Sequence, residues 1–194
     1  DLRTPLTRMR LQLAMMERDE NIDDLLEDVS EMERMVNGYL DFARGEGKEK
    51  IEPTDIGRLI ADTLAGLHKN GLSVRFARNA DLTMNIRRND LKRCLWNLVT
   101  NAGRYGTRID VAMTVSEKTL EIDVEDDGPG IPPAKRDEVF KAFFRMDESR
   151  NSETGGVGLG LTITRDIVLA HGGKIYMTDS AALGGLKVVM LFPI

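Results

Sequence analysis

Four polar residues share one side of a predicted helix and could together bind a ligand that carries phosphates. Asn97 and Asn101 are four residues apart, and Arg104 and Tyr105 lie one turn further on. Residues three and four apart are neighbours on a helix surface. Asparagine is a poor helix former, so two in mid-helix cost stability without another gain. Amide oxygens suit Mg²⁺, which takes few protein ligands and relies on phosphates and water for the rest. A solvated polar face is the alternative.

A second candidate lies between Glu125 and Pro132, after a strand-like run of alternating apolar residues. In Asp127-Gly128-Pro129-Gly130 a carboxylate meets two glycines that a proline separates. Glycine permits positive φ and the close approach of another molecule, and proline stiffens the loop. A rigid loop at the end of a buried strand could hold a ligand, although plain turns have the same composition.

A third candidate is a glycine cluster that runs directly into a predicted helix. Its sequence is Gly155-Gly156-Val157-Gly158-Leu159-Gly160. Backbone N–H groups at a glycine-rich helix start bind anions readily. The spacing matches neither a Walker loop, which would need Lys followed by Ser or Thr, nor a Rossmann fingerprint. A phosphate site and a flexible loop with a tight entry turn both fit this cluster.

Helices and strands must hold these candidates in place, and hydrophobic periodicity predicts them. A helix is predicted over 90–105 from the apolar stripe Leu91, Cys94, Leu95, Leu98, Val99 and Ala102. Further helices are predicted over 54–67, with Thr54 as its cap, and over 159–170. Strands are predicted over 73–77, 82–86, 109–115, 120–124, 174–178 and 186–192. We therefore expect an α/β sandwich, with about three helices on one face of a mostly antiparallel sheet.

Residues 1–44 show a different pattern, two segments with a heptad repeat. The seam positions are Leu2, Leu6, Met9, Leu13 and Met16, then Ile22, Leu25, Val29, Met32, Val36, Tyr39 and Ala43. Such a helical hairpin buries too little surface to be stable alone. We expect two copies of the chain to form a homodimeric four-helix bundle. A hairpin that packs on the rest of its own chain is the alternative.

Segment 45–50 is polar and interrupted by glycines, which predicts a linker. The chain then divides into a helical hairpin, residues 1–45, and a sandwich domain, residues 51–194, of overall α+β class. The net charge of −5 argues against a nucleic-acid-binding surface. The single cysteine, Cys94, excludes an intramolecular disulfide and fits a reducing compartment.

No apolar run approaches the roughly 20 residues that span a bilayer. The chain begins on Asp1 inside a helical pattern, without an initiator methionine. We therefore expect a cytoplasmic fragment of a longer bacterial protein, in which membrane spans would belong to missing N-terminal segments.

The candidates occur in a fixed order, and with the heptad hairpin they resemble the sensor histidine kinases of bacterial two-component systems. Asn97 to Tyr105 resembles the asparagine box of that family, and Asp127 to Gly130 its first glycine box. Phe140 to Phe144 resembles its phenylalanine box, and Gly156 to Gly160 its second glycine box. The start, Asp1-Leu-Arg-Thr-Pro-Leu, resembles the segment after the phosphorylated histidine. Within the family the chain is most similar to EnvZ-type osmosensor kinases, which act with OmpR-like regulators.

The resemblance implies a Bergerat-type fold that binds ATP with Mg²⁺. Asp127 would accept a hydrogen bond from the adenine amino group, since carboxylates would repel phosphate. Asn101, with Asn97 beside it, would hold Mg²⁺, and residues 145–157 would cover the ATP. The implied nucleotide-binding residues are Asn97, Asn101, Arg104, Tyr105, Asp127, Gly128, Gly130, Ile131, Phe143, Arg145, Arg150, Gly156, Val157, Gly158, Leu159 and Gly160.

The phosphorylated histidine of the family would immediately precede Asp1 and is not in this sequence. His68 and His171 do not replace it, and we interpret His171, at a helix end, as structural. By resemblance, Asp1 would orient or deprotonate that histidine, and Thr4 would help to place water for dephosphorylation of the regulator. Helix capping at a frayed end is the alternative for Asp1 and Thr4. The sequence as it stands is expected to bind ATP without phosphorylating itself.

The sequence therefore predicts the core of a sensor histidine kinase. It would transfer the γ-phosphoryl group of ATP to a histidine and on to an aspartate of a response regulator, and could also act as a phosphatase of that regulator. The alternative is an ATP-binding phosphatase or a degenerate scaffold that docks a regulator. An ATPase of the chaperone or topoisomerase kind is disfavoured, because it would carry Glu where Asn97 stands, to activate water.

Overall fold

The computed structural model describes residues 3–16, 21–23, 25–26, 29–30, 32, 49–68, 72–146 and 158–194. Helix α1 spans Arg3–Ala14, and the described residues between 21 and 32 are also helical. Across these ranges, no helix combines the length and the apolar character needed to cross a membrane.

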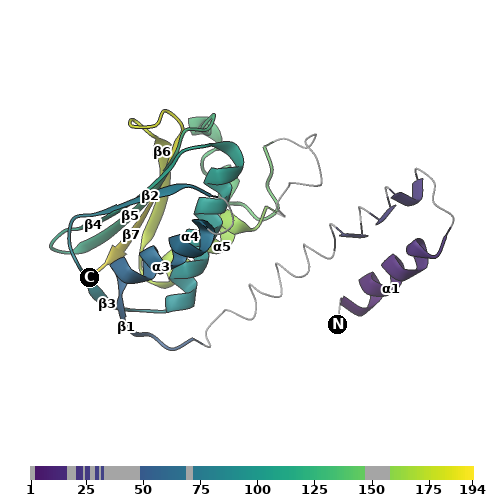
Figure 1. The fold of residues 1–194 in the computed structure, drawn as a ribbon, viewed down its shortest axis with the longest axis horizontal. Helices are drawn as coiled ribbons and strands as arrows, with labels where there is room; N and C mark the ends of the chain where they lie inside the picture. Colours follow the sequence, from purple (N-terminus) through teal and green to yellow (C-terminus); the bar gives the residue numbers. More distant parts are fainter. Residues whose placement is uncertain are drawn as a thin grey trace.

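A five-stranded sheet with three helices on one face forms the larger part of the fold (Figure 1). The helices are α3 (Ile56–His68), α4 (Arg88–Tyr105) and α5 (Gly160–Ala170). The strand order is β2 (Val74–Arg78), β4 (Ile109–Val115), β5 (Thr119–Asp126), β7 (Leu186–Pro193) and β6 (Lys174–Asp179). Only the β2–β4 pair of this sheet is parallel. The expected sandwich and its mostly antiparallel sheet are confirmed.

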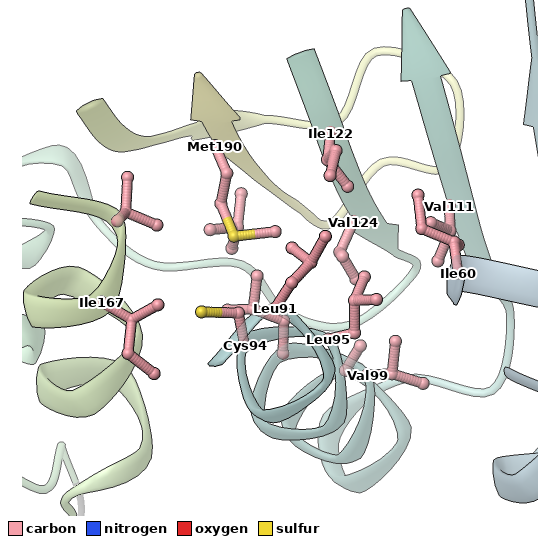
Figure 2. Packing of buried hydrophobic residues seen from close by; sticks show 14 of the residues in the cluster. Ile60, Leu91, Cys94, Leu95, Val99, Val111, Ile122, Val124, Ile167 and Met190 are labelled. Carbon is pink, nitrogen blue, oxygen red and sulfur yellow. The ribbon is translucent and has the colours of Figure 1, made fainter. Parts of the chain in front are cut away.

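The core lies between the helices and the inward face of the sheet. All six residues of the predicted α4 stripe are buried, with at most 4% of each exposed. They meet alternate residues of the central strands, among them Val111 on β4, Ile122 and Val124 on β5 and Met190 on β7 (Figure 2). Ile60 on α3 and Ile167 on α5 close the two flanks of this layer. Burial raises the pKa of the Cys94 thiol, so Cys94 is an unreactive core residue.

Two details differ from the sequence prediction. A short strand β1 (Glu52–Asp55) was not expected, and it pairs with β3 (Thr83–Ile86) in a separate two-stranded sheet. Thr54 is therefore a strand residue, and its hydroxyl donates to the Glu52 carbonyl. The cap of α3 is Asp55, whose Oδ1 accepts a hydrogen bond from the Arg58 N–H at 3.0 Å. Two short 3₁₀ turns, Pro133–Lys135 and Glu138–Phe140, follow β5.

The start of α4 is held by groups from elsewhere in the chain. Arg87, at the N-cap, makes no side-chain cap. Instead the Glu49 carboxylate accepts the Asn89 N–H, at 2.9 and 3.2 Å from its two oxygens. His171 Nε2 accepts the Arg87 N–H at 3.4 Å, while Nδ1 lies 2.8 Å from the Ile167 carbonyl and donates to it. His171 thus joins the end of α5 to the start of α4, which agrees with its interpretation as structural.

We expect Glu49→Ala to lower the free energy of unfolding by about 1 kcal/mol, because it removes the acceptor for an N–H group at the start of a helix. Urea unfolding followed by the fluorescence of Trp96, the single tryptophan and a residue of α4, measures this change. Glu117→Ala, in the exposed turn between β4 and β5, is the matched control and should change stability by less than about 0.5 kcal/mol. Equal effects of the two substitutions would contradict the cap.

A cluster of charged residues lies on the outward face of the sheet. Lys187 Nζ is 2.8 Å from Asp123 Oδ2 and 3.3 Å from Glu125 Oε1. The other Asp123 oxygen, Oδ1, is buried, and among the described residues no N–H or charged group donates a hydrogen bond to it. Burial, and then the hydrogen bond with Asp123, raise the pKa of Glu121. Protonated Glu121 can therefore donate a hydrogen bond to Asp123, which its charged form cannot.

We expect Glu121→Gln to stabilise the fold near neutral pH. The pKa of Glu121 is raised, so its stabilising contribution is complete below the ordinary glutamate pKa and is lost as pH rises through the folded-state value. A glutamine amide would keep donating to Asp123 at every pH. Urea midpoints should be higher for the variant at pH 7 and should converge with the parent near about pH 4. Glu117→Gln is the control, and a pH-independent difference would refute the raised pKa of Glu121.

Candidate functional site

The first contact of the site joins α4 to the start of α5. Asn97 Nδ2 donates to the Gly160 carbonyl at 3.1 Å, and the Thr164 hydroxyl donates to the same carbonyl at 2.8 Å. A carbonyl can only accept, so the amide nitrogen of Asn97 must face it and Oδ1 is left for another partner. Thr164 is fully buried, and a Cβ on Gly160 would lie 3.5 Å from Asn97 Cγ. The structure thus brings together two residues that the sequence assigned to one site.

Asn101 lies one turn further along α4. Its side chain is half-buried and makes no hydrogen bond within the described part of the chain. An amide that is partly withdrawn from water and has no protein partner is available to a ligand. Arg104 and Tyr105, at the end of α4, are exposed, and no described carboxylate pairs with Arg104. These groups line the same end of the helix as the Asn97 contact.

Two neighbouring carboxylates at the end of β5 point into different surroundings. Asp126 is 7% exposed, and its Oδ1 accepts the Gly128 N–H at 2.9 Å and the Leu186 N–H at 3.3 Å. Burial raises the pKa of Asp126 despite these two donors. The carboxylate of Asp127 is bound instead by Thr107 and Arg108, and their N–H groups lower its pKa. Asp126 is a candidate that the sequence reasoning missed.

Glycines let three backbone segments meet beside Asp126. A Cβ on Gly106 would lie 2.7 Å from Asp127 Oδ1, and one on Gly128 would lie 2.9 Å from the Tyr105 carbonyl oxygen. A Cβ on Gly185 would lie 2.4 Å from the Asp126 carbonyl oxygen. At Gly128 and Gly185 no other residue type fits without a backbone shift, and at Gly106 the Asp127 side chain would have to move. Three backbone segments are therefore closely packed around a buried carboxylate.

The predicted glycine loop has a positive φ at one position, a conformation that glycine adopts without strain. Gly130 has φ of +70°, which other residues rarely adopt. Ile131 follows it half-buried against the core, and its carbonyl accepts the Arg136 Nε–H at 2.8 Å. The loop is therefore held at both ends.

The residues that flank segment 147–157 lie side by side. The Phe143 N–H donates to the Gly158 carbonyl at 3.1 Å, and both residues have positive φ, 64° and 73°. A Cβ on Gly158 would be 3.0 Å from the Phe143 backbone. The Phe143 side chain is 54% exposed, whereas Leu159, the next residue after Gly158, is 9% exposed. These contacts place the start of α5 against the phenylalanine stretch.

Some predicted site residues are not described by the structure. Asp1, Arg150, Gly156 and Val157 lie outside the described residues. Arg145 is described and half-buried. Thr4 is exposed on α1, distant in sequence from the other candidates.

No group of three or more Asp, Glu, His or Cys side chains in the described ranges is placed to hold a metal ion. A metal at this end of α4 would need the amides of Asn97 and Asn101 and oxygens of another molecule. That composition is the one Mg²⁺ uses with nucleotide phosphates.

The heptad seam of the N-terminal segment is buried at alternate positions. Leu6, Ile22 and Val29 are at most 8% exposed. Leu13 is half-buried, and the remaining seam residues described here are 41 to 55% exposed, namely Met9, Met16, Leu25 and Met32. The exposed residues recur at the heptad spacing, 9 and 16, then 25 and 32. An apolar stripe of this kind is typical of a helix that packs against another helix.

Two protein-family models match the chain. Residues 86–194 match the family described as "Histidine kinase-, DNA gyrase B-, and HSP90-like ATPase". Residues 1–48 match the "His Kinase A (phospho-acceptor) domain". The first match begins at Ile86, just before α4, and includes α4, the end of β5 and the start of α5.

Curated relatives match over the whole chain. The sensor histidine kinase CpxA of Escherichia coli K12 is 32% identical over 210 residues, which cover 100% of this chain and 45% of CpxA. The sensor protein RstB of the same strain is 32% identical over 207 residues, covering 100% of this chain and 47% of RstB. The chain therefore spans less than half the length of these relatives.

Solved structures show the same arrangement. The histidine kinase domain of the E. coli osmosensor EnvZ matches with a TM-score of 0.59 and 30% identity, over 77% of this chain and 92% of that one. Full-length ShkA in complex with AMPPNP matches with a TM-score of 0.71 and 26% identity, over 99% of this chain and 43% of that one. The likeness to ShkA includes the N-terminal helical segment as well as the sandwich.

Proposed function

Since the chain belongs to the sensor histidine kinase family, we propose that it binds Mg-ATP where the end of α4 meets the start of α5 and delivers the γ-phosphoryl group to a histidine. A response-regulator aspartate would receive the group next, and the same chain would also dephosphorylate that regulator. The observation that carries the proposal is the Asn97–Gly160 contact, which lies beside an Asn101 amide that has no hydrogen-bond partner among the described residues.

The residues at the end of β5 fit the base of ATP. Asp126 is buried, only its Oδ1 is hydrogen-bonded within the described residues, and the close packing of backbone at Gly106, Gly128 and Gly185 fixes its surroundings. We therefore assign the hydrogen bond from the adenine amino group to Asp126 rather than to Asp127, whose oxygens already accept from Thr107 and Arg108. Gly130, Ile131 and Tyr105 would border the ring.

The residues along α4 and α5 fit the phosphates and the metal. Asn101 would bind Mg²⁺, with Oδ1 of Asn97 beside it, because amide oxygens suit a hard cation. Arg104, Arg145 and Arg150 would neutralise phosphate charge, with Phe143 at the base of the covering segment. The backbone N–H groups of Gly156, Val157, Gly158, Leu159 and Gly160 would face the phosphates at the start of α5. ATP supplies the phosphoryl group, and the chain supplies position and charge.

The partner of the N-terminal segment would be a second copy of the chain. The exposed stripe of Met9, Met16, Leu25 and Met32 gives each hairpin an apolar surface that a homodimeric four-helix bundle would cover. Thr4, exposed near the start of α1, would take part in dephosphorylation, together with Asp1 beside the acceptor histidine. An OmpR-like regulator, and membrane attachment of the full-length protein, belong to this proposal through the EnvZ likeness.

A non-kinase scaffold is the rival function. A degenerate site has no need to keep two amides in mid-helix at a cost in helix stability. It also has no need for a contact that leaves Asn97 Oδ1 available. These features favour a working nucleotide site.

Asn101→Ala should weaken binding of ATP in the presence of Mg²⁺ by about tenfold or more, a loss of about 1.4 kcal/mol. Without Mg²⁺, parent and variant should bind ATP with similar affinity, because the lost group is a metal ligand. Calorimetric titration of the chain with ATP measures both affinities. Asn89→Ala is the matched control, since Asn89 is exposed at the opposite end of the same helix. Unchanged affinity with Mg²⁺ would exclude the metal role of Asn101.

A chain extended by one histidine immediately before Asp1 should become phosphorylated when incubated with Mg-ATP labelled on its γ-phosphate. The phosphate should be labile in acid and stable in base, because it is attached to a histidine nitrogen. The control is the same extension with glutamine, which should incorporate no label. Labelling of neither chain, while both bind ATP, would favour the non-kinase rival.

A further inference from the structure

Two loops of the proposed ATP site leave the same end of a pair of neighbouring strands. Residues 106–108 lead from α4 into β4, and residues 127–132 leave β5. Ile109 at the start of β4 is paired with Asp126 at the end of β5. The residues just outside this pair, Arg108 and Asp127, are therefore neighbours, although they are far apart in the sequence.

Asp127 binds the first of these loops with both of its oxygens. Oδ1 accepts the N–H groups of Thr107 at 2.6 Å and Arg108 at 2.9 Å. Oδ2 accepts the Thr107 hydroxyl at 2.9 Å. Three donors from two consecutive residues thus converge on one carboxylate. Hydrogen bonds that backbone N–H groups donate to a charged acceptor are shorter and stronger than those between neutral groups.

Steric contacts restrict the same loop from the other side. A Cβ on Gly106 would lie 2.7 Å from Asp127 Oδ1, so Asp127 approaches the backbone there more closely than any other residue type at position 106 would allow. A Cβ on Gly128, next to Asp127, would lie 2.9 Å from the Tyr105 carbonyl oxygen. The backbone at the end of α4 is thereby packed against the loop that carries Asp127.

Asp126 and Asp127 have separate environments because successive strand residues point to opposite faces. Asp126 is buried and bound by Gly128 and Leu186, whereas Asp127 is on the accessible side with its oxygens on Thr107 and Arg108. The N–H groups of Arg108 and Thr107 lower the pKa of Asp127, which keeps the carboxylate charged. To reach a bound base, Asp127 would have to give up these bonds.

We propose that Asp127 is a positioning residue of the nucleotide site, whose carboxylate fixes Thr107 and Arg108 and so holds Arg104 and Tyr105 where ATP binds. The proposal rests on the proposed function, and it separates two adjacent carboxylates by role. Asp126 contacts the base, and Asp127 acts only through the loop that it binds. Loss of Asp127 therefore weakens the binding of every nucleotide by the same factor. Loss of a contact with the base would instead change the preference of the site among bases.

The test compares affinities of the chain for ATP and for ITP, which lacks the exocyclic amino group, both with Mg²⁺. Asp127→Ala should lower the affinity for both nucleotides by about fivefold or more and leave the ratio of ATP affinity to ITP affinity unchanged. Asp127→Asn should retain most of the affinity, because its amide oxygen still accepts both N–H groups. Asp126→Asn should instead lower the ratio. Asp137→Asn, a substitution at an exposed aspartate without a side-chain cap, is the matched control.

A second variant tests the contact itself. Thr107→Val removes the hydroxyl that donates to Asp127 Oδ2, and it should lower the affinity for both nucleotides by about twofold. Combined with Asp127→Ala it should cause little further loss, since both changes remove the same contact. Full additivity of the two effects would contradict the proposed route through Thr107.

Amide hydrogen exchange without nucleotide separates this proposal from the proposed function. In Asp127→Ala the amides of Thr107 and Arg108 should exchange faster, with the melting temperature of the sandwich close to that of Asp137→Asn. A large decrease in the ratio of ATP affinity to ITP affinity in Asp127→Ala would mean that Asp127 contacts the base, and would overturn the proposal. Unchanged affinity and unchanged exchange would also overturn it. If the parent chain binds no Mg-ATP, the proposed function fails and the positioning role fails with it, even where the exchange result shows the contact.

Discussion

The packing of α4 against the sheet determines where the polar groups of the site lie. Its six-residue apolar stripe is buried against β4, β5 and β7, which sets the rotation of the helix about its axis. With 3.6 residues per turn, that rotation places Asn97 and Asn101 on the flank toward α5. Asn97 then bonds to the Gly160 carbonyl, so the hydrophobic layer and the site share one helix position. A change in the core that rotated α4 would move every proposed ligand on it.

The end of β5 depends on a second constraint, the close approach of three backbone segments. Three glycines make this approach possible: Gly106 between α4 and β4, Gly128 after β5, and Gly185 between β6 and β7. Each lies closer to backbone or carboxylate atoms than a residue with a side chain could. The donors on Asp126 and Asp127 come from the same three places: Thr107 and Arg108 precede β4, Gly128 follows β5, and Leu186 is the first residue of β7. The local contacts thus give two adjacent carboxylates opposite pKa shifts, upward for the buried one and downward for the accessible one.

The sequence predicted the elements with strong periodicity and missed those that depend on distant partners. Helix α4 begins two residues earlier than expected and ends at Tyr105 as expected, because its apolar stripe is continuous. Strand β1 was missed because its four residues are mostly polar and include a proline, so its strand character comes from pairing with β3. The burial of Asp126 could have been predicted from the sequence. Leu120, Ile122 and Val124 are buried, and the same alternation reaches Asp126. The partners of Asp127 had no such signal, since Thr107 and Arg108 are 20 and 19 residues away.

Asn97 connects the architecture to the proposed chemistry. Its amide nitrogen is held by a carbonyl acceptor, which leaves an oxygen able to bind a cation but unable to take a proton from water. A carboxylate at this position could serve as a general base and hydrolyse the bound ATP. It would also place a negative charge beside the Gly160 carbonyl oxygen, which now lies 3.1 Å from Asn97 Nδ2, and lose the donor that joins α4 to α5. The same amide therefore joins the two helices and supplies no base, which in the proposed function would keep the phosphoryl group for an acceptor outside the sandwich.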